Sequence, residues 1–252
     1  MLTQTTDSFF TREEIEQLNV QRVPHHIAFI PDGNRRWAKA HSFDVTEGHR
    51  KGSDNIITIV KAAKEMGVKA VTYYLFSTEN WTRPRLEISA LMWLLQKYLV
   101  EKTPEMIENG ARLHTIGDLT RFSAATQKAL ADCKQATAHC NAIDMIFALN
   151  YGSRDEIRRA VQHLSRQCLQ GQLTPDQITE ELISKSLDTA AWPDPDLLIR
   201  TSGEKRISNY LLWQLSYTEL YPCDILWPDF NPRHLLQAVI DFQKRERRLG
   251  GP

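Results

Sequence analysis

The chain alternates short apolar runs, typical of buried strands, with longer segments of helical periodicity. Six runs have the length and composition of buried strands: 27–30, 70–76, 113–116, 143–149, 197–199 and 225–227. Strands that alternate with helices favour a mostly parallel sheet that is covered on both faces. We therefore expect an α/β fold with a central six-stranded sheet flanked by helices.

Helical spacing and terminal residues predict the helices between these runs. The predicted segments are a helix around 56–64, a long helix over 86–107 and another over 155–169. Asn231 followed by Pro232 is a good N-cap and first-turn pair for a last helix that ends near residue 247. No repeat or linker divides the sequence, so we expect a polar N-terminal arm over 1–24 and one domain over 25–252.

Composition limits the possible partners. The 252 residues carry 31 basic and 31 acidic side chains, so no overall field attracts nucleic acid. Any anion site must come from local clusters of arginine. The N-terminal segment has no basic start, and no stretch reaches the roughly 18 apolar residues of a membrane span. The four cysteines lack metal-binding spacing. We expect a cytoplasmic protein that does not bind nucleic acid.

The residues after the first apolar run have the parts of a site for a metal-bound diphosphate. Asp32 is a hard oxygen ligand for Mg²⁺, Gly33 permits close backbone approach, and Asn34 adds an amide. Arg35 and Arg36 can make bidentate contacts with phosphate oxygens. An ordinary strand-to-helix turn with solvated arginines is the alternative interpretation.

Two more polar segments follow predicted strands, at the sheet edge where ligands of open α/β sheets usually bind. The segment after 70–76 contains Ser77, Thr78, Glu79, Asn80, Trp81 and Arg83. The segment after 197–199 contains Arg200, Lys205, Arg206, Ile207 and Ser208, just ahead of a predicted helix near 209–217. The second segment suggests another anion site. The alternatives are a capped polar loop and a surface turn with solvated charges.

Three further features are ambiguous from sequence. Glu219, set among apolar neighbours, is either a hydrogen-bonded structural residue or a second Mg²⁺ ligand. His49 is either a phosphate donor or a packing residue. The helix over 86–107 is apolar on more than one face, so it is either sandwiched in the core or lines an apolar cavity. Together with the arginines, this helix suggests a ligand with a diphosphate head and an apolar tail.

The sequence resembles the cis-prenyltransferase family from about residue 26 to residue 250. The motifs that carry the resemblance are Asp32-Gly33-Asn34-Arg35-Arg36-Trp37-Ala38, Phe76-Ser77-Thr78-Glu79-Asn80-Trp81 with Arg83-Pro84, Asn150-Tyr151-Gly152, Ile199-Arg200-Thr201-Ser202-Gly203-Glu204 and Arg206-Ile207-Ser208-Asn209. Their order and spacing match those of the family, which makes the set highly specific.

The resemblance implies a homodimer with an apolar tunnel between the helices and the sheet. The implied reaction is sequential condensation of isopentenyl diphosphate with farnesyl diphosphate, with Mg²⁺, each new double bond being cis. The implied product is undecaprenyl diphosphate, the lipid-carrier precursor for bacterial cell-wall synthesis. The alternatives are a shorter product and a non-catalytic family subunit, and a phosphohydrolase or nucleotide-binding enzyme is a further rival. Transient contact with a membrane surface is also expected because the product is a lipid.

The resemblance also implies roles for individual residues. Asp32 would engage Mg²⁺ with Glu219 and assist departure of the allylic diphosphate. Asn80 is the family position for the proton acceptor, but an amide has negligible basicity, so Ser77 or a diphosphate oxygen is the alternative. The implied allylic site comprises Gly33, Asn34, Arg35, Arg36 and His49. The implied isopentenyl site comprises Arg200, Arg206, Ile207 and Ser208. The other implied substrate contacts are Trp37, Ser77, Thr78, Glu79, Trp81 and Arg83.

Several positions depart from the family pattern or extend it. Val45 stands where many family members have an arginine, so one phosphate contact is missing. Arg35 stands where many members have a glycine, and we expect its guanidinium to replace that contact. Leu75 replaces a common alanine, and this could narrow the tunnel and shorten the product. Arg248 and Gly250 resemble a tail that reaches the diphosphate site of a partner subunit.

Overall fold

The computed structural model describes residues 8–246, which form a 6-stranded sheet in a single α/β domain. The strands are β1 (His26–Ile30), β2 (Ala70–Ser77), β3 (Ala111–Ile116), β4 (Ile143–Tyr151), β5 (Leu197–Arg200) and β6 (Glu219–Pro222). Their order in the sheet is β3-β4-β2-β1-β5-β6, and every pairing among the described residues is parallel. The predicted parallel six-stranded sheet is therefore confirmed. The family tail at Arg248 and Gly250 lies outside the described residues.

The prediction of the sixth strand was wrong. Residues 225–227 lead into a short 3-10 helix, Trp227–Asp229, because Pro228 cannot donate to a strand ladder. The true sixth strand, Glu219–Pro222, pairs only with β5 and has partly exposed residues along its length. An edge strand of this kind lacks the continuous apolar run that marks the buried strands.

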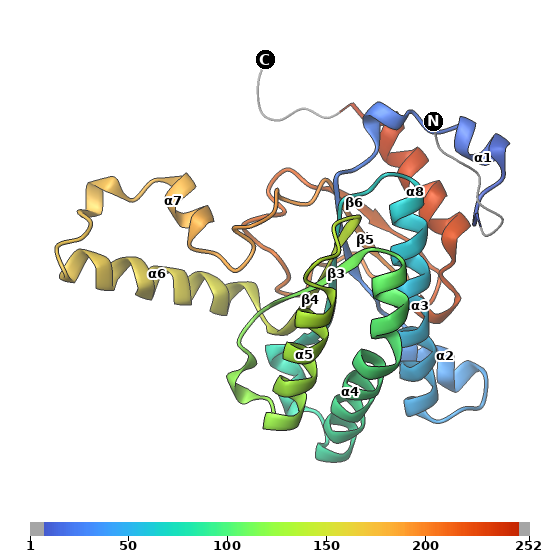
Figure 1. Cartoon of the computed structure of the whole chain (residues 1–252), viewed down its shortest axis with the longest axis horizontal. Coiled ribbons are helices and arrows are strands. Elements are labelled where there is room, and N and C mark those ends of the chain that lie inside the picture. Colours follow the sequence, from blue (N-terminus) through green and yellow to red (C-terminus); the bar gives the residue numbers. More distant parts are fainter. Residues whose placement is uncertain (1–7, 247–252) are drawn as a thin grey trace.

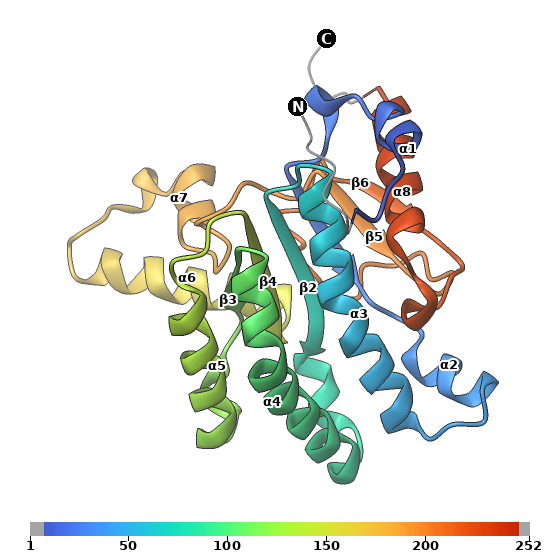
Figure 2. The ribbon, with the colours of Figure 1, turned by 45° about the vertical axis from the view of Figure 1, so that its right-hand side comes forward.

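Helices cover one face of the sheet. Figures 1 and 2 show α3 (Val45–Glu65), α4 (Arg85–Glu108) and α5 (Ala124–Thr137) side by side there, with α8 (Pro232–Lys244) beyond α3. Alternate strand residues such as Phe29, Tyr73 and Phe147 pack beneath them in the larger core cluster. The predicted helices over 56–64 and 86–107 and from Asn231 are confirmed, whereas α5 was not predicted.

The other face of the sheet is covered mainly by irregular chain. Ala28, Ile30 and Leu198 pack there against Tyr210 and Leu211. The helix predicted near 209–217 does not form, and that segment consists of turns. The backbone explains this, because Asn209 and Leu211 have left-handed φ angles of 62° and 49°.

Two segments extend the domain. Helices α6 (Ser153–Leu169) and α7 (Glu180–Lys185) project from the body as an arm (Figure 1). At the N-terminal end, α1 (Arg12–Glu16) lies in a segment that buries Phe10 and Leu18 in the core, so the part of the predicted polar arm that is described packs on the domain. Among residues 8–246, no helix is both long enough and apolar enough to cross a membrane.

Candidate active site

The carboxyl ends of three neighbouring strands bring the predicted polar segments together. β1 lies between β2 and β5, so the residues that follow these strands meet at one edge of the sheet. A cavity of about 770 Å³ opens there. Its wall includes these predicted site residues: Asp32, Gly33, Asn34, Arg35, Arg36, His49, Ser77, Glu79, Asn80, Arg83 and Ser208. The structure therefore brings residues from all three predicted polar segments together around one cavity.

We use the name β1 loop for residues 31–36, which comprise the short connection after β1 and the first turn of the next helix. Gly33 has a φ of 110° and directly precedes α2 (Asn34–Ala40), a helix that was not predicted. A Cβ at Gly33 would lie 2.9 Å from Leu226 Cδ2, so both the backbone angle and the close packing require glycine. Asp32 is fixed through its main chain, since its N–H donates to Thr201 Oγ1 (2.8 Å) and its carbonyl accepts from Trp227 N–H (3.0 Å).

Arg200, the last residue of β5, joins the two arginine-bearing segments. Its guanidinium donates to Asp32 Oδ2 (2.9 Å), to Ser208 Oγ (2.7 Å) and to the Arg206 carbonyl. The side chain is only 7% exposed, whereas that of Asp32 is 33% exposed. The terminal nitrogens of Arg200 thus bind protein oxygens, whereas its Nε is buried without a hydrogen-bond partner. Asp32 still faces the cavity.

Glu204 lies between two exposed arginines, one from each segment. Arg36 Nη2 lies 3.3 Å from Glu204 Oε1, and Arg206 donates to Glu204 Oε2. Arg36 also donates to Ser202 Oγ and lies 4.0 Å from Asp32 Oδ1. Both guanidiniums are at least half exposed. They can therefore reorient toward an anionic ligand at a small cost in pairing energy.

The chain from 200 to 209, which we call the β5 loop, is held in an unusual conformation. Ser202, Ser208 and Asn209 have φ angles of 74°, 51° and 62°. Such left-handed angles are uncommon for residues other than glycine and are enriched at functional sites. Asn209 fixes the loop by donating to Glu79 Oε1 (2.9 Å) and accepting from Arg154 N–H (3.0 Å).

His49 and Asn34 form a buried polar pair at the cavity wall. Asn34 Nδ2 lies 3.4 Å from His49 Nδ1. Asn34 Oδ1 and His49 Nε2 are buried without a hydrogen-bond partner. Burial, with help from the positive charge of Arg83, lowers the pKa of His49 to about 4, so the imidazole is neutral near pH 7. The pair offers an acceptor and a ring nitrogen to whatever occupies the cavity.

The segment after β2 presents its amide and one arginine to the same cavity. Asn80 Oδ1 accepts from Ser77 N–H (3.1 Å) in the 3-10 helix Thr78–Thr82. The Asn80 NH₂ group remains as a donor. Arg83 and Arg35 both approach Glu87 Oε1, at 3.1 and 3.7 Å, so Glu87 connects the start of α4 with the β1 loop.

Two predicted substrate-contacting tryptophans pack elsewhere. Trp37 Nε1 donates to Asp229 Oδ1 (2.8 Å), and its ring stacks on His41. Trp81 Nε1 donates to Asn150 Oδ1 (2.7 Å), and its ring packs against Phe76 at 5.0 Å. Both tryptophans thus hold their own segments against the protein, and neither lines the cavity. The other predicted residues outside the cavity wall are Thr78, Arg200, Arg206, Ile207 and Glu219.

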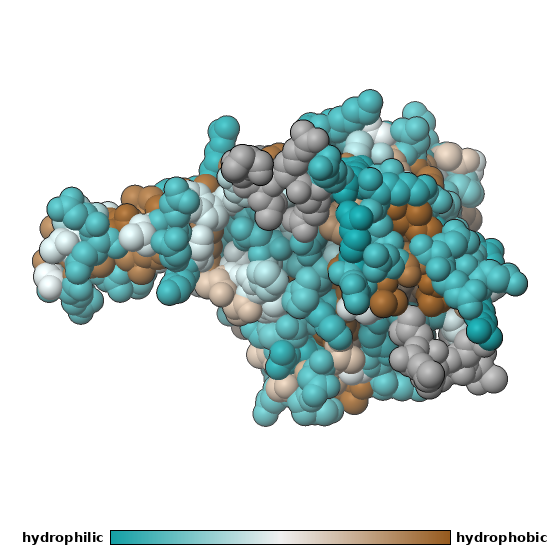
Figure 3. All heavy atoms as spheres, turned by 90° about the horizontal axis from the view of Figure 1, so that it is seen from above, coloured by the Kyte–Doolittle hydropathy of each residue, from teal (hydrophilic) through white to brown (hydrophobic). Residues whose placement is uncertain are grey.

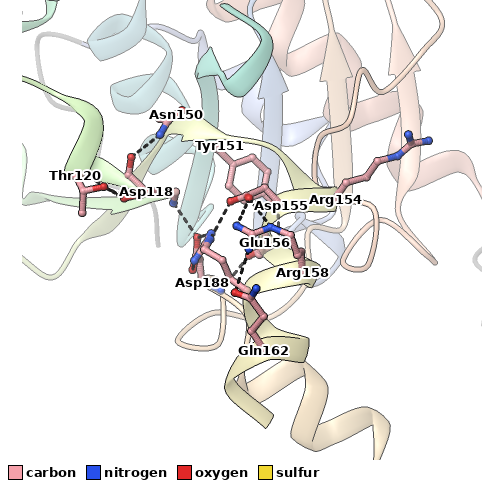
Figure 4. Close-up of polar contacts among 12 residues, drawn as sticks. Asp118, Thr120, Asn150, Tyr151, Arg154, Asp155, Glu156, Arg158, Gln162 and Asp188 are labelled. Carbon is pink, nitrogen blue, oxygen red and sulfur yellow. Dashed lines mark hydrogen bonds and ion pairs between the residues drawn. The ribbon is translucent and has the colours of Figure 1, made fainter. Parts of the chain in front are cut away.

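The Asn150-Tyr151-Gly152 segment joins these loops to the arm. Figure 4 shows Asn150 reaching the Asp118 carbonyl (2.7 Å) and Tyr151 reaching Glu156 Oε2 (2.5 Å). Burial raises the pKa of Glu156. Gly152 has to be glycine because a Cβ would lie 2.6 Å from Thr78 Oγ1. These contacts hold the segment after β2 and the β5 loop in place on the side next to α6.

Glu219 does not join Asp32 within one chain. Glu219 is the first residue of β6 and pairs in register with Leu197, three residues before Arg200. Three residues of strand correspond to about 10 Å, so Glu219 lies near the amino-terminal ends of the strands, away from the cavity. Its carboxylate pairs there with Arg245 Nη1 (2.9 Å).

The deeper cavity wall is apolar and comes largely from α4. Leu91, Leu95 and Tyr98 of α4 line it, and Leu75 of β2 contributes to the wall. The ambiguity over this helix is thus resolved, because one side of α4 faces the cavity. Sequence reasoning did not identify Trp227 as a wall residue, because its position after the apolar residues 225 and 226 suggested a strand.

Comparison with known proteins identifies the family. A model of the family described as "Putative undecaprenyl diphosphate synthase" matches residues 30–250. The isoprenyl transferase of Bacillus cereus is 44% identical over 237 residues, covering 94% of this chain and 92% of the relative. The isoprenyl transferase of Chlamydia trachomatis is 45% identical over 232 residues, covering 90% and 92%.

Two solved structures share the fold. Lavandulyl diphosphate synthase from Lavandula x intermedia, in complex with dimethylallyl diphosphate, superposes with a TM-score of 0.89 at 33% identity, covering 92% of this chain and all of that one. A probable undecaprenyl diphosphate synthase from Campylobacter jejuni gives 0.75 at 32% identity, covering 90% and 99%. The chain therefore belongs to the undecaprenyl diphosphate synthase family of prenyltransferases.

Proposed function

We propose that the chain elongates farnesyl diphosphate by repeated condensation with isopentenyl diphosphate, forming cis double bonds. In each round the bond from the allylic C1 to its diphosphate oxygen breaks, a carbon–carbon bond forms to the isopentenyl double bond, and a proton is lost. The proposed final product is undecaprenyl diphosphate. The observation that carries the proposal is a cationic sheet edge that opens directly onto an apolar cavity.

The two arginine-bearing loops supply positive charge where the reaction needs it. In the proposal, Arg36 and Asn34 hold the allylic diphosphate beside Gly33, and Arg206 and Ser208 hold the isopentenyl diphosphate. Preorganised donors aimed at a departing diphosphate stabilise the charge that develops on it. Arg200 acts as a positioning residue because its two terminal nitrogens already donate to Asp32, Ser208 and the Arg206 carbonyl.

A magnesium ion fits this site if the diphosphate shares it. Asp32 offers one cavity-facing carboxylate, and Mg²⁺ commonly binds one or two carboxylates together with water and substrate phosphates. Among residues 8–246, no group of three or more His, Cys, Asp or Glu side chains forms a ready-made metal cage. We propose that Asp32 holds the ion, which when bound neutralises charge on the leaving diphosphate.

Asn80 orients substrate in this proposal and is not the base. Its carbonyl oxygen already accepts from Ser77 N–H, so the amide presents N–H donors to the cavity. A donor can bind a diphosphate oxygen but cannot accept a proton. A diphosphate oxygen held near Asn80 is the proposed proton acceptor, with the Ser77 hydroxyl as the alternative.

Leu75 favours a second candidate, a synthase of shorter cis-prenyl diphosphates. It belongs to the cavity wall, where a larger side chain leaves less space for the growing chain. In either case we propose that the cavity serves as the apolar tunnel of the family. Leu75→Ala is expected to shift the products toward longer chains. An unchanged product distribution would dismiss this role.

We also propose a homodimer that uses the projecting arm. Val161 on α6 is exposed, and Figure 3 shows hydrophobic side chains gathered along the arm. Exposed apolar side chains on a projecting arm favour a partner surface. Sedimentation of the purified chain at the mass of two copies would support this proposal, and a single-copy mass at micromolar concentration would refute it.

The test of the reaction is incubation of the purified protein with farnesyl diphosphate, radiolabelled isopentenyl diphosphate and Mg²⁺. Dephosphorylated products are then sized beside an Asp32→Ala control. A ladder that ends near undecaprenyl and is absent from the control is the expected result. Only short products would favour the second candidate. No product from folded protein that binds both substrates would favour a non-catalytic subunit.

A further inference from the structure

Helix α4 is apolar on two sides. Its inner side lines the cavity through residues such as Leu91 and Tyr98. Its outer side carries large apolar residues spaced by seven, with exposed fractions of 86%, 54%, 72% and 37%: Leu86, Trp93, Val100 and Ile107. Seven residues make nearly two helical turns, so these side chains form one row along the helix. We call this row the outer stripe of α4.

A small cleft connects the outer stripe with the substrate cavity. It has a volume of about 210 Å³ and lies where the first turns of α3 and α4 approach each other. The exposed residues Val45 and Leu86 line it. His49, Leu91 and Leu94 line both this cleft and the larger cavity. Apolar surface therefore continues from the cavity wall to the first residue of the stripe.

We propose that the outer stripe of α4 docks on the surface of a lipid bilayer, with the cleft facing the lipid. The inference rests on the proposed function, because a prenyl chain made in the cavity has to pass into hydrocarbon. Trp93 suits the level of the lipid headgroups, and Lys97 Nζ lies 5.2 Å from the centre of its ring. Lysine can keep its charge in the headgroup layer while its stem lies on apolar surface.

The dimensions of the stripe favour a bilayer over a second copy of the chain. The stripe follows one helix of 24 residues and is one side chain wide. A stable protein interface buries about 800 Å² per partner through roughly 20–30 residues. A fluid bilayer has no such requirement, because an apolar helix face only has to enter the headgroup boundary by about 5–10 Å. The zero net charge points to apolar attachment, so neutral lipid is the suitable probe.

Flotation with phosphatidylcholine vesicles tests the proposal on the full-length protein. The variant Leu86→Ser/Trp93→Ser/Val100→Ser removes most of the stripe. The matched control Val20→Ser/Tyr217→Ser removes two large side chains of 66% and 63% exposure that lie outside both α4 and the arm. We expect wild type and control to float with the vesicles, and the bound fraction of the stripe variant to fall by about tenfold or more. Circular dichroism confirms that each variant is folded.

Three results would overturn the proposal. The wild type could remain unbound, the stripe variant could bind as well as the wild type, or the stripe variant could sediment at half the wild-type mass. The last result would place the stripe between two copies of the chain. Flotation requires no substrate, so it is independent of the prenyl-transfer assay. In detergent, the stripe variant is expected to keep wild-type prenyl transfer if that activity exists.

Discussion

The β1 and β5 loops both bring arginines to the same sheet edge, but they do so by different means. The β1 loop is short and leads into α2, which leaves Arg35 and Arg36 more than half exposed. The β5 loop is longer, has left-handed serine and asparagine residues, and buries Arg200. A helix start orients the first loop, and hydrogen bonds to a buried guanidinium orient the second.

This difference separates arginines that can bind a ligand from one that builds the site. An exposed guanidinium can exchange a carboxylate for a diphosphate with little change in folding free energy. A buried guanidinium that satisfies three oxygens cannot leave them without a large cost. Residue type alone does not distinguish these roles. The following substitutions test the distinction, from the largest expected effect to the smallest.

Arg200→Ala is expected to lower the free energy of unfolding by about 2–4 kcal/mol, because it leaves Asp32 and Ser208 without their donor. Arg206→Ala is the matched control from the same loop. Its exposed side chain predicts a change within about 0.5 kcal/mol. Urea unfolding of both variants measures the difference. Equal losses of stability would show that burial does not separate a structural arginine, Arg200, from the exposed arginines that can bind a ligand.

Gly33→Ala is expected to cost about 1–3 kcal/mol, because both φ and the contact with Leu226 oppose a Cβ. Gly67→Ala separates the two causes, since Gly67 has a φ of 96° and nothing within 4 Å of a Cβ. The excess loss at Gly33 measures the packing of the β1 loop. Thermal unfolding at one pH provides the comparison, and an equal loss at both glycines would rule out the packing contribution.

The buried His49 predicts that the free energy of unfolding depends on pH, as does His26, whose pKa burial also lowers to about 4. The His49 pKa of about 4 lies below the ordinary value of 6.5, so the unfolded state binds the proton more readily. The neutral ring is compatible with folding above pH 6.5, and stability is lost as pH falls from 6.5 toward 4. His49→Asn is expected to reduce the stability difference between pH 7 and pH 5 by about 1–2 kcal/mol. The same pH dependence in both proteins would contradict this assignment.

Arg35→Gly is expected to produce the smallest change. Arg35 is mostly exposed and approaches Glu87 at 3.7 Å, so its loss should hardly affect stability. We expect the KM for farnesyl diphosphate to rise by about threefold to tenfold, because Val45 offers no replacement cation. The KM for isopentenyl diphosphate serves as the internal control. Unchanged affinity for the allylic substrate would refute the proposed compensation for Val45.

Much of the fold was predictable because buried parallel strands carry continuous apolar runs. β1 to β5 were found in this way. The edge strand β6 was missed because Glu219–Pro222 is short and at least partly exposed along its whole length, so it lacks a buried apolar run. The absence of a helix near 209–217 depends on left-handed angles at residues that sequence patterns assign to ordinary turns or helices.

The location of the site was predictable, whereas the roles of its residues were less so. Motifs after strands β1, β2 and β5 identified the cavity edge. The directions of Trp37 and Trp81 depend on distant partners, Asp229 and Asn150, which no local pattern reveals. Glu219 lies at the amino-terminal end of β6, away from the cavity, because it pairs in register with Leu197. This register was unknown until the sixth strand was located.

The most direct test of the central claim is the KM of each substrate for Arg36→Ala and Arg206→Ala, measured with farnesyl and isopentenyl diphosphates. Both arginines pair with Glu204, so the two variants disturb the same carboxylate. We expect Arg36→Ala to raise mainly the KM for farnesyl diphosphate, and Arg206→Ala to raise mainly the KM for isopentenyl diphosphate. Equal changes in both KM values for both variants would contradict a division of the two diphosphates between the β1 and β5 loops.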